Sequence, residues 1–241
     1  MNKQFERTAS LLGREAIDIL SRCHVAVFGV GGVGGYVAEV LARSGVGEIS
    51  LFDKDCVDIT NLNRQIIALQ STIGQPKVEV MAKRIADINP DCVVHPCHLF
   101  YLPENADEVD LTQFSYVIDC IDNVTAKLEL IRRCHRLNLP IISSMGAANK
   151  LDATAFRVAD LSKTKVDPLA RILRQRLRRE GIHHLKVVYS EETPLSPQVP
   201  INSDGRQAPA SNAWVPPAAG LVIGGEVVKD LCLRQTSQLP S

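Results

Sequence analysis

The sequence predicts an α/β fold with a doubly wound, mostly parallel sheet and a C-terminal extension. Short apolar runs rich in β-branched residues alternate with stretches of helical spacing, the pattern that lays strands side by side beneath helices. A glycine-rich segment, GVGGVGG, separates the first such strand from the helix that follows it. With 241 residues, 45% of them hydrophobic, the chain can bury one sizeable core.

The predicted elements follow in order along residues 1–150. Apolar spacing predicts a first helix over residues 9–21. Buried strands are predicted at residues 25–28, 49–53, 92–99, 116–120 and 140–145. One helix follows the glycine loop and stops at Gly45, and a second opens at Pro76 and closes at the Asn89-Pro90 pair. A third follows the strand at 116–120 and reaches about Leu137.

The alternation weakens after residue 150, so we divide the chain into a core, residues 1–150, and a C-terminal part, residues 151–241. Residues 163–186 hold eight basic and two acidic residues. Residues 191–217 are rich in Pro, Ser and Asn and are expected to form a long loop. The last helix is expected over residues 218–233.

Overall charge and cysteine content exclude several classes of protein. The 27 basic and 27 acidic residues cancel, so no whole-protein charge favours nucleic acid or an anionic membrane. The seven cysteines have no CxxC pair, which argues against a disulfide framework and against a four-cysteine zinc site. The start, MNKQFERTAS, has no apolar stretch behind its charges and is not expected to be a signal peptide, and the most apolar run, 213–225, is too short to span a bilayer. We therefore expect no membrane insertion and a cytoplasmic location with reduced thiols.

The glycine loop predicts a nucleotide site. Gly29, Gly31 and Gly34 fit the pattern GxGxxG between a strand and a helix, with Gly32 beside them. Glycines let the backbone approach a phosphate, and the helix N-terminus supplies free N–H groups. Asp53, 19 residues after Gly34, ends the second strand, where a carboxylate accepts hydrogen bonds from a ribose. By itself this pattern is typical of an NAD-dependent oxidoreductase.

Further charged residues favour a triphosphate over a dinucleotide. Arg64 ends the segment DKDCVDITNLNR, and Lys77 begins a predicted helix. Asp122 and Asn123 follow the strand at 116–120, at the sheet edge where doubly wound folds bind ligands. Two cations and a second carboxylate should therefore converge on the glycine loop. Cations hold phosphate charge, and a carboxylate can hold Mg2+, so the expected cofactors are ATP and Mg2+.

Five segments in one chain resemble the ThiF/MoeB adenylating enzymes of the ubiquitin-activating-enzyme-like superfamily: GVGGVG, DKD, NLNRQ, GQPK and IDN. The resemblance implies that residues 1–150 form a Rossmann-like adenylation core and that Asp122 binds Mg2+. It implies ribose binding by Asp53 and phosphate contacts from Asn61, Arg64 and Lys77, while Asp55 is either a nucleotide contact or a structural residue. These enzymes are typically homodimers, and Arg7, in FERT, resembles an arginine that each subunit inserts into its partner's site.

Three more segments resemble the tRNA threonylcarbamoyladenosine dehydratases within this superfamily: TASLLG, DLSKTKVDPLARILRQRLRREG and WVPPAAGLVIGGEVV. The resemblance implies that ATP activates the carboxylate of a threonylcarbamoyl adenosine beside the tRNA anticodon, and that the carbamoyl group then closes a ring. Some members carry a cysteine in the loop before the last helix, whereas this chain reads APASNAWVPPAAG there. We therefore assign no catalytic cysteine.

The basic segment suits a tRNA partner. Arg171, Arg174 and Arg178 recur at helical spacing and predict one cationic helix face. The opposite face is expected to be apolar, formed by Leu169, Ile172, Leu173 and Leu177. A cationic face of this kind can contact the phosphates of a tRNA.

Two other classes of function stay open at the level of sequence. The same core would support an activator of a ubiquitin-like sulfur-carrier protein, with a cysteine-desulfurase or sulfur-carrier system as partner. The glycine loop alone would also fit an NAD-dependent oxidoreductase or a nucleotide sensor.

Overall fold

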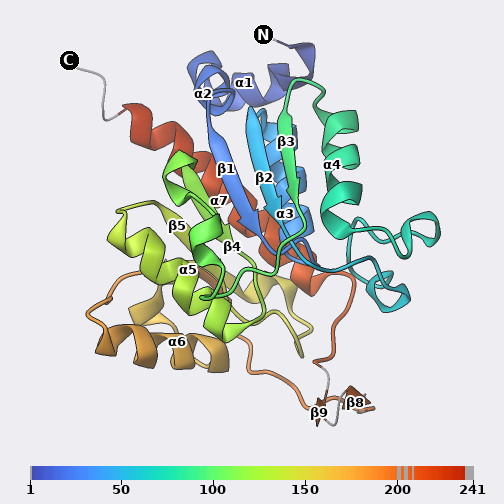
Figure 1. Ribbon diagram of the computed structural model, residues 1–241, viewed down its shortest axis with the longest axis vertical. Coiled ribbons are helices and arrows are strands. Elements are labelled where there is room, and N and C mark those ends of the chain that lie inside the picture. The colour runs from blue at the N-terminus through green and yellow to red at the C-terminus, as the bar shows by residue number, and fades with distance from the viewer. Residues whose placement is uncertain (1, 200–201, 204–205, 208, 237–241) are drawn as a thin grey trace.

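The computed structural model describes residues 2–199, 202–203, 206–207 and 209–236, and it confirms the predicted α/β fold (Figure 1). Its main sheet has seven strands: β1 (His24–Phe28), β2 (Glu48–Phe52), β3 (Val93–Cys97), β4 (Tyr116–Asp119), β5 (Ile141–Ser144), β6 (Phe156–Asp160) and β7 (Lys186–Ser190). Their order across the sheet is β3-β2-β1-β4-β5-β7-β6. All neighbours are parallel except β6 and β7.

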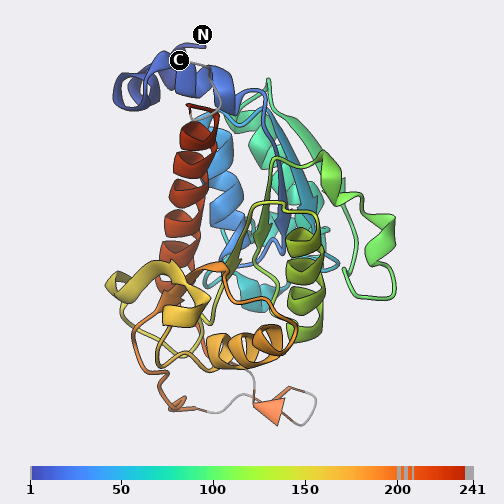
Figure 2. The same ribbon diagram turned by 90° about the vertical axis from the view of Figure 1, so that its left-hand side faces the viewer.

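Helices cover both faces of this sheet. They are α1 (Glu6–Leu12), α2 (Arg14–Leu20), α3 (Gly34–Ser44), α4 (Lys77–Ile88), α5 (Val124–Arg136), α6 (Pro168–Arg179) and α7 (Val215–Thr236). Figure 2 shows α3 and α7 side by side on one face and α5 on the other. α4 packs on the same face as α3, whereas α6 packs beside α5 in a separate apolar cluster. None of the described helices is both long enough and apolar enough to cross a membrane.

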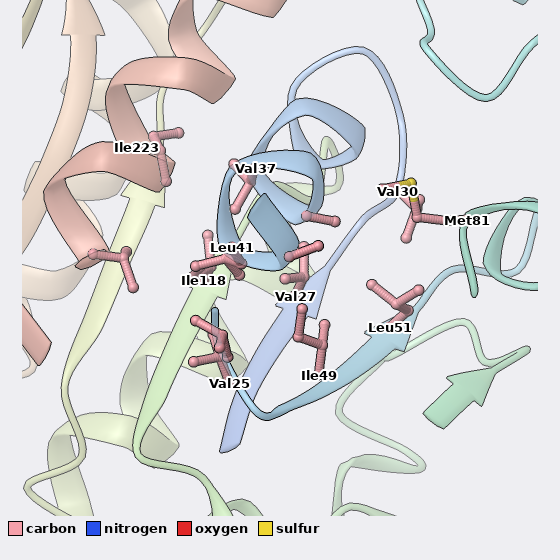
Figure 3. Packing of buried hydrophobic residues seen from close by; sticks show 14 of the residues in the cluster. Val25, Val27, Val30, Val37, Leu41, Ile49, Leu51, Met81, Ile118 and Ile223 are labelled. Atoms are coloured by element: carbon pink, nitrogen blue, oxygen red, sulfur yellow. The ribbon is translucent and has the colours of Figure 1, made fainter. Parts of the chain in front are cut away.

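The largest apolar cluster lies between the sheet and the pair α3 and α7. β-branched side chains of β1, β2 and β4 face the helices, as their alternation predicts. Figure 3 shows this packing, with Val25, Val27, Ile49, Leu51 and Ile118 from strands and Val37, Leu41 and Ile223 from helices. The cluster fixes the strand ends that carry the nucleotide site.

Several boundaries differ from the sequence predictions, each for a local reason. The single helix predicted over residues 9–21 is wrong: α1 and α2 are separated by Gly13, whose φ of 92° no helix accepts. The last helix begins at Val215 rather than Ala218, because Pro216 and Pro217 occupy its first turn, where no backbone donor is lost.

The sequence analysis did not predict two strands of the main sheet, β6 and β7. β7 shares only its first residue, Lys186, with the basic segment, and its apolar run is limited to residues 187–189. In β6, Arg157 and Asp160 interrupt the apolar residues, so it gives no continuous apolar run. Both belong to residues 151–241 yet join the sheet of the core, and the division at residue 150 stays a prediction. The predicted loop 191–217 contains a short hairpin of β8 (Asn202–Ser203) and β9 (Arg206–Gln207), while residues 200–201, 204–205 and 208 lie outside the described residues.

Candidate nucleotide-binding site

A cavity of about 490 Å³ opens at the carboxyl ends of β1, β2 and β4. The chain leaves β1 and β4 toward opposite sides of the sheet, and this is the switch point where doubly wound folds bind ligands. The first turn of α7 and the segment before it close the cavity from the other side. Its lining includes most of the predicted site: Gly29, Gly31, Gly32, Asp53, Asp55, Asn61, Arg64, Lys77 and Asp122.

The glycine loop is packed too closely to accept a side chain at Gly29 or Gly34. Gly29 has φ 90°, and a Cβ built on it would lie 2.6 Å from the Cys120 carbonyl oxygen. A Cβ on Gly34 would collide with the Gly29 carbonyl oxygen, so Gly34 shapes the loop without lining the cavity. The loop therefore presents backbone to the cavity, just before the N-terminus of α3, which is the arrangement that binds phosphate.

Asp53 joins the glycine loop to the end of β2. Its Oδ2 accepts a hydrogen bond from the Val30 N–H at 2.7 Å, and its Oδ1 accepts one from the Asp55 N–H at 2.9 Å. Each carboxylate oxygen retains a second lone pair. Asp53 can therefore accept ribose hydroxyls while it holds the loop in place.

Lys77, the first residue of α4, reaches the cavity as a buried cation. Its side chain is 7% exposed, and its Nζ lies 3.1 Å from Oδ2 of Asp55. The Lys77 N–H also donates to the Asp55 carbonyl oxygen at 3.0 Å. Asp55 thus positions Lys77 and lines the cavity itself, so both of the roles considered for it are compatible with this geometry.

Asn61 ends the short 3-10 helix Ile59–Asn61, and Arg64 lies in the turn that follows it. Arg64 Nη1 donates to the Thr60 carbonyl oxygen at 3.0 Å, which orients the guanidinium group, and burial lowers its pKa. The group stays charged, since arginine does not lose its proton in proteins. Asn61 Oδ1 accepts the Asp58 N–H at 3.1 Å, which leaves Nδ2 to donate to a ligand.

Asp122 and Asn123 follow the same strand but differ in placement. Asp122 is exposed and lines the cavity, and it forms no hydrogen bond or ion pair within the described part of the chain. Asn123 does not line the cavity; its Oδ1 caps α5 by accepting the Ala126 N–H at 3.0 Å.

Arg7 lies outside the cavity of its own chain. It is exposed on α1, which packs at the amino ends of the strands, opposite the site (Figure 1). Arg7 can therefore reach a nucleotide site only in another subunit.

A buried polar network supports the loop that carries Asp122. Lys127 and Asp119 have no solvent exposure, and Lys127 Nζ lies 2.9 Å from Asp119 Oδ2. The Ser143 hydroxyl donates to the same oxygen, and Asp119 Oδ1 accepts the Ile121 N–H at 3.1 Å. This network ties β4, β5 and α5 together directly beneath the site.

The lining also includes three polar residues to which the sequence analysis assigned no role: Gln65, Tyr101 and Ser211. Gln65 Oε1, the Tyr101 hydroxyl and Ser211 Oγ are the buried side-chain oxygens without a hydrogen-bond partner among the described residues. All three belong to residues of this one cavity, so its surface is built for a polar ligand. Gln65 could have been selected because it completes NLNRQ, but Tyr101 and Ser211 lie in connections without periodic signal.

Cys120 is the cysteine that lines the cavity, at the end of β4. Burial raises the pKa of its thiol to about 12, so the group stays protonated near neutral pH. The structure thus offers no reactive thiolate here.

The predicted cationic helix exists as α6, but its arginines are not equivalent. Arg171 and Arg178 are exposed, whereas Arg174 Nη1 donates to the Thr164 carbonyl and hydroxyl oxygens at 3.0 and 2.6 Å. Arg174 therefore anchors the segment before α6, and these hydrogen bonds restrict how freely its guanidinium group can reach a ligand. On the apolar side Leu173 and Leu177 are buried, but Ile172 is 39% exposed and does not belong to that face.

Comparison with known proteins agrees with this geometry. The model of the ThiF family matches residues 5–195. The chain is 47% identical over 242 aligned positions to the tRNA threonylcarbamoyladenosine dehydratase of Bacillus subtilis, covering 96% of this chain and 95% of that protein.

Solved structures of a related enzyme have the same fold. The crystal structures of Escherichia coli tRNA N6-threonylcarbamoyladenosine dehydratase, TcdA, in complex with ATP and with AMP superpose with TM-scores of 0.90 and 0.89 at 37% and 38% identity. Each superposition covers 98% of this chain, and the two cover 97% of the chain in the ATP complex and 96% of the chain in the AMP complex. The fold, the lining of the cavity and these matches together place the chain in the ThiF family.

Proposed function

We propose that the chain is an ATP-dependent tRNA threonylcarbamoyladenosine dehydratase. The observation that carries the proposal is the single cavity in which the glycine loop, Arg64, Lys77 and Asp122 meet. Relatives with this activity in their names, and TcdA structures in complex with ATP and AMP, support the same conclusion. The family assignment favours adenylation over hydride transfer.

The lining offers groups that suit each part of ATP. Leu99, Phe100, Ile121 and the ring of Tyr101 supply apolar surface that can cover a flat base. Asp53 then accepts the ribose hydroxyls. The glycine loop, Asn61, Arg64 and Lys77 face the phosphates, whose charge requires cations and N–H donors.

Mg2+ fits beside Asp122. Asp53 and Asp55 already hold the glycine loop and Lys77, whereas Asp122 presents an exposed carboxylate with no partner among the described residues. Carboxylate and phosphate oxygens are the ligands that Mg2+ prefers. When bound there, the ion would neutralise phosphate charge as the pyrophosphate leaves.

The first chemical step joins two anions. A carboxylate oxygen of the threonylcarbamoyl group attacks the α-phosphorus of ATP, and the bond from that phosphorus to pyrophosphate breaks. The carboxylate is ionised near pH 7, so no base is required. Arg64 and Lys77 lower the barrier by neutralising charge and aligning the reactants.

The second step closes the ring. The carbamoyl group attacks the acyl carbon of the acyl-adenylate, the bond to AMP breaks, and the proton that the carbamoyl group loses passes to solvent. The substrate thereby loses one oxygen to AMP, which gives the net dehydration.

The active unit is proposed to be a cytoplasmic homodimer that binds tRNA. Arg7, remote from its own cavity, is assigned to the partner subunit's site. The exposed Arg171 and Arg178 of α6 are assigned to tRNA phosphates. A sulfur-carrier protein is the alternative acyl substrate that the pyrophosphate-exchange experiment below tests.

The test is exchange of labelled pyrophosphate into ATP with different acyl substrates. We expect exchange that depends on tRNA carrying threonylcarbamoyl adenosine, and formation of the cyclic product with release of AMP. Exchange with a Gly-Gly-ended carrier protein but not with tRNA would identify a sulfur-carrier activator instead. Tight NAD binding without ATP binding would overturn adenylation altogether.

A further inference from the structure

A second cluster of ligand-type side chains lies at the opposite end of the sheet from the nucleotide cavity. His24 begins β1, Glu48 begins β2, and His95 lies in the middle of β3. His24 pairs with Glu48 across the sheet, and Glu48 pairs with Val93, two residues before His95. Because side chains alternate along a strand, all three project from the same face.

The distances within the cluster suit a metal ion. Glu48 Oε1 lies 3.6 Å from His24 Nδ1 and 2.7 Å from His95 Nε2, and the three ligand atoms lie within 4.8 Å of one another. Metal–ligand bonds of about 2.0–2.1 Å in a tetrahedral site place neighbouring ligand atoms about 3.4 Å apart. The two shorter distances bracket this value, so small side-chain rotations would complete a three-ligand site.

Neighbouring side chains hold the His24 imidazole in an orientation that suits metal binding. Its other ring nitrogen, Nε2, lies 2.9 Å from Oγ of the buried Ser50, the kind of outer contact that orients a metal-binding imidazole. The ring also packs edge-on against Phe114, with 4.7 Å between centroids.

We propose that His24, Glu48 and His95 bind one divalent transition-metal ion of the Zn2+ class, which joins the edge strand β3 to β1 and β2. Two imidazoles and one carboxylate form a known zinc ligand set that leaves a fourth position for water. Imidazole nitrogen favours Zn2+ over Mg2+, so this site is distinct in chemistry from the carboxylate at Asp122. The ion would stabilise β3, an edge strand whose Val93 is 54% exposed.

The first experiment titrates chelator-stripped full-length protein with Zn2+ against a chromophoric chelator, and follows thermal unfolding with and without the ion. We expect one equivalent of Zn2+ per chain and a higher unfolding temperature when it is bound. The variants His95→Ala and Glu48→Gln should lose both effects. The matched control is His183→Ala, which removes an exposed histidine away from the cluster and should bind as the parent does.

Two further measurements separate this site from other metal binding. Ser50→Ala should weaken the affinity about 10- to 100-fold, because it removes the contact that orients His24. Co2+ should give visible bands without the sulfur charge-transfer band that cysteine ligands produce, and Asp122→Asn should change nothing. Equal affinity in His95→Ala and the parent would overturn the proposal, and so would a sulfur charge-transfer band.

Discussion

Substitution of two buried lysines can distinguish a residue needed for catalysis from a residue needed for stability. Lys77 pairs with Asp55 at the cavity, and Lys127 pairs with Asp119 beneath it, at 3.1 and 2.9 Å. The carboxylate of Asp55 is 53% exposed, whereas that of Asp119 is fully buried. We consider Lys77→Met and Lys127→Met, which keep most of the side-chain volume and remove the charge.

The expected losses of stability differ because the carboxylate left without its lysine is exposed to water at Asp55 and fully buried at Asp119. Removing one partner of a fully buried ion pair costs about 3–5 kcal/mol, which for a chain of this size lowers the unfolding temperature by roughly 6–20 °C. In Lys77→Met the Asp55 carboxylate keeps contact with water, so the loss should be at most about 1 kcal/mol, or roughly 4 °C. Lys77→Met should nevertheless reduce pyrophosphate exchange by about 10²- to 10³-fold, the usual effect of removing one group that stabilises transition-state charge.

The assay measures unfolding temperature and tRNA-dependent pyrophosphate exchange on both variants under the same conditions. The proposed roles require a stable, inactive Lys77→Met and a strongly destabilised Lys127→Met. Near-parental exchange by Lys77→Met would remove Lys77 from the phosphate site. An unchanged unfolding temperature in Lys127→Met would refute the assignment of the Asp119 network as structural.

The remaining predictions concern the dimer, the tRNA surface and the buried thiol. Mixing inactive Arg7→Ala and Asp122→Ala chains should restore part of the activity, because one site of the mixed dimer receives both wild-type residues; no recovery despite mixed dimers would place Arg7 outside catalysis. Replacing Arg171 and Arg178 by Glu should weaken tRNA binding without affecting ATP binding. It should also flatten the dependence of log affinity on log salt by about 0.7–0.9 per lost phosphate contact; an unchanged slope would mean that these arginines are only solvated. Cys120, with its raised pKa, should be alkylated at pH 8 far more slowly than free cysteine, and faster as the pH rises; mass spectrometry showing rapid labelling would contradict this.

Local sequence patterns determined most of the core and most of the residues that we propose for phosphate binding. Strands β1 to β5 were predictable because each is a short apolar run between turn or helix signals, and parallel strands then bring their carboxyl ends together. The glycine loop, Asp53, Lys77 and Asp122 were predictable because each follows or precedes such an element at a fixed distance along the chain. These features depend on neighbours within a few residues, which a sequence displays directly.

Contacts between distant segments were decided only by the tertiary structure. Strand β7, which begins at the last residue of the basic segment, pairs with β5, and Tyr101 and Ser211 reach the cavity from connections with no periodic pattern. The sequence gives no sign that Arg174 donates a hydrogen bond to Thr164. His24, Glu48 and His95 lie close together only because β1, β2 and β3 are adjacent in the sheet. Pairing of this kind depends on packing free energy summed over the whole core, so no local window of the sequence contains it.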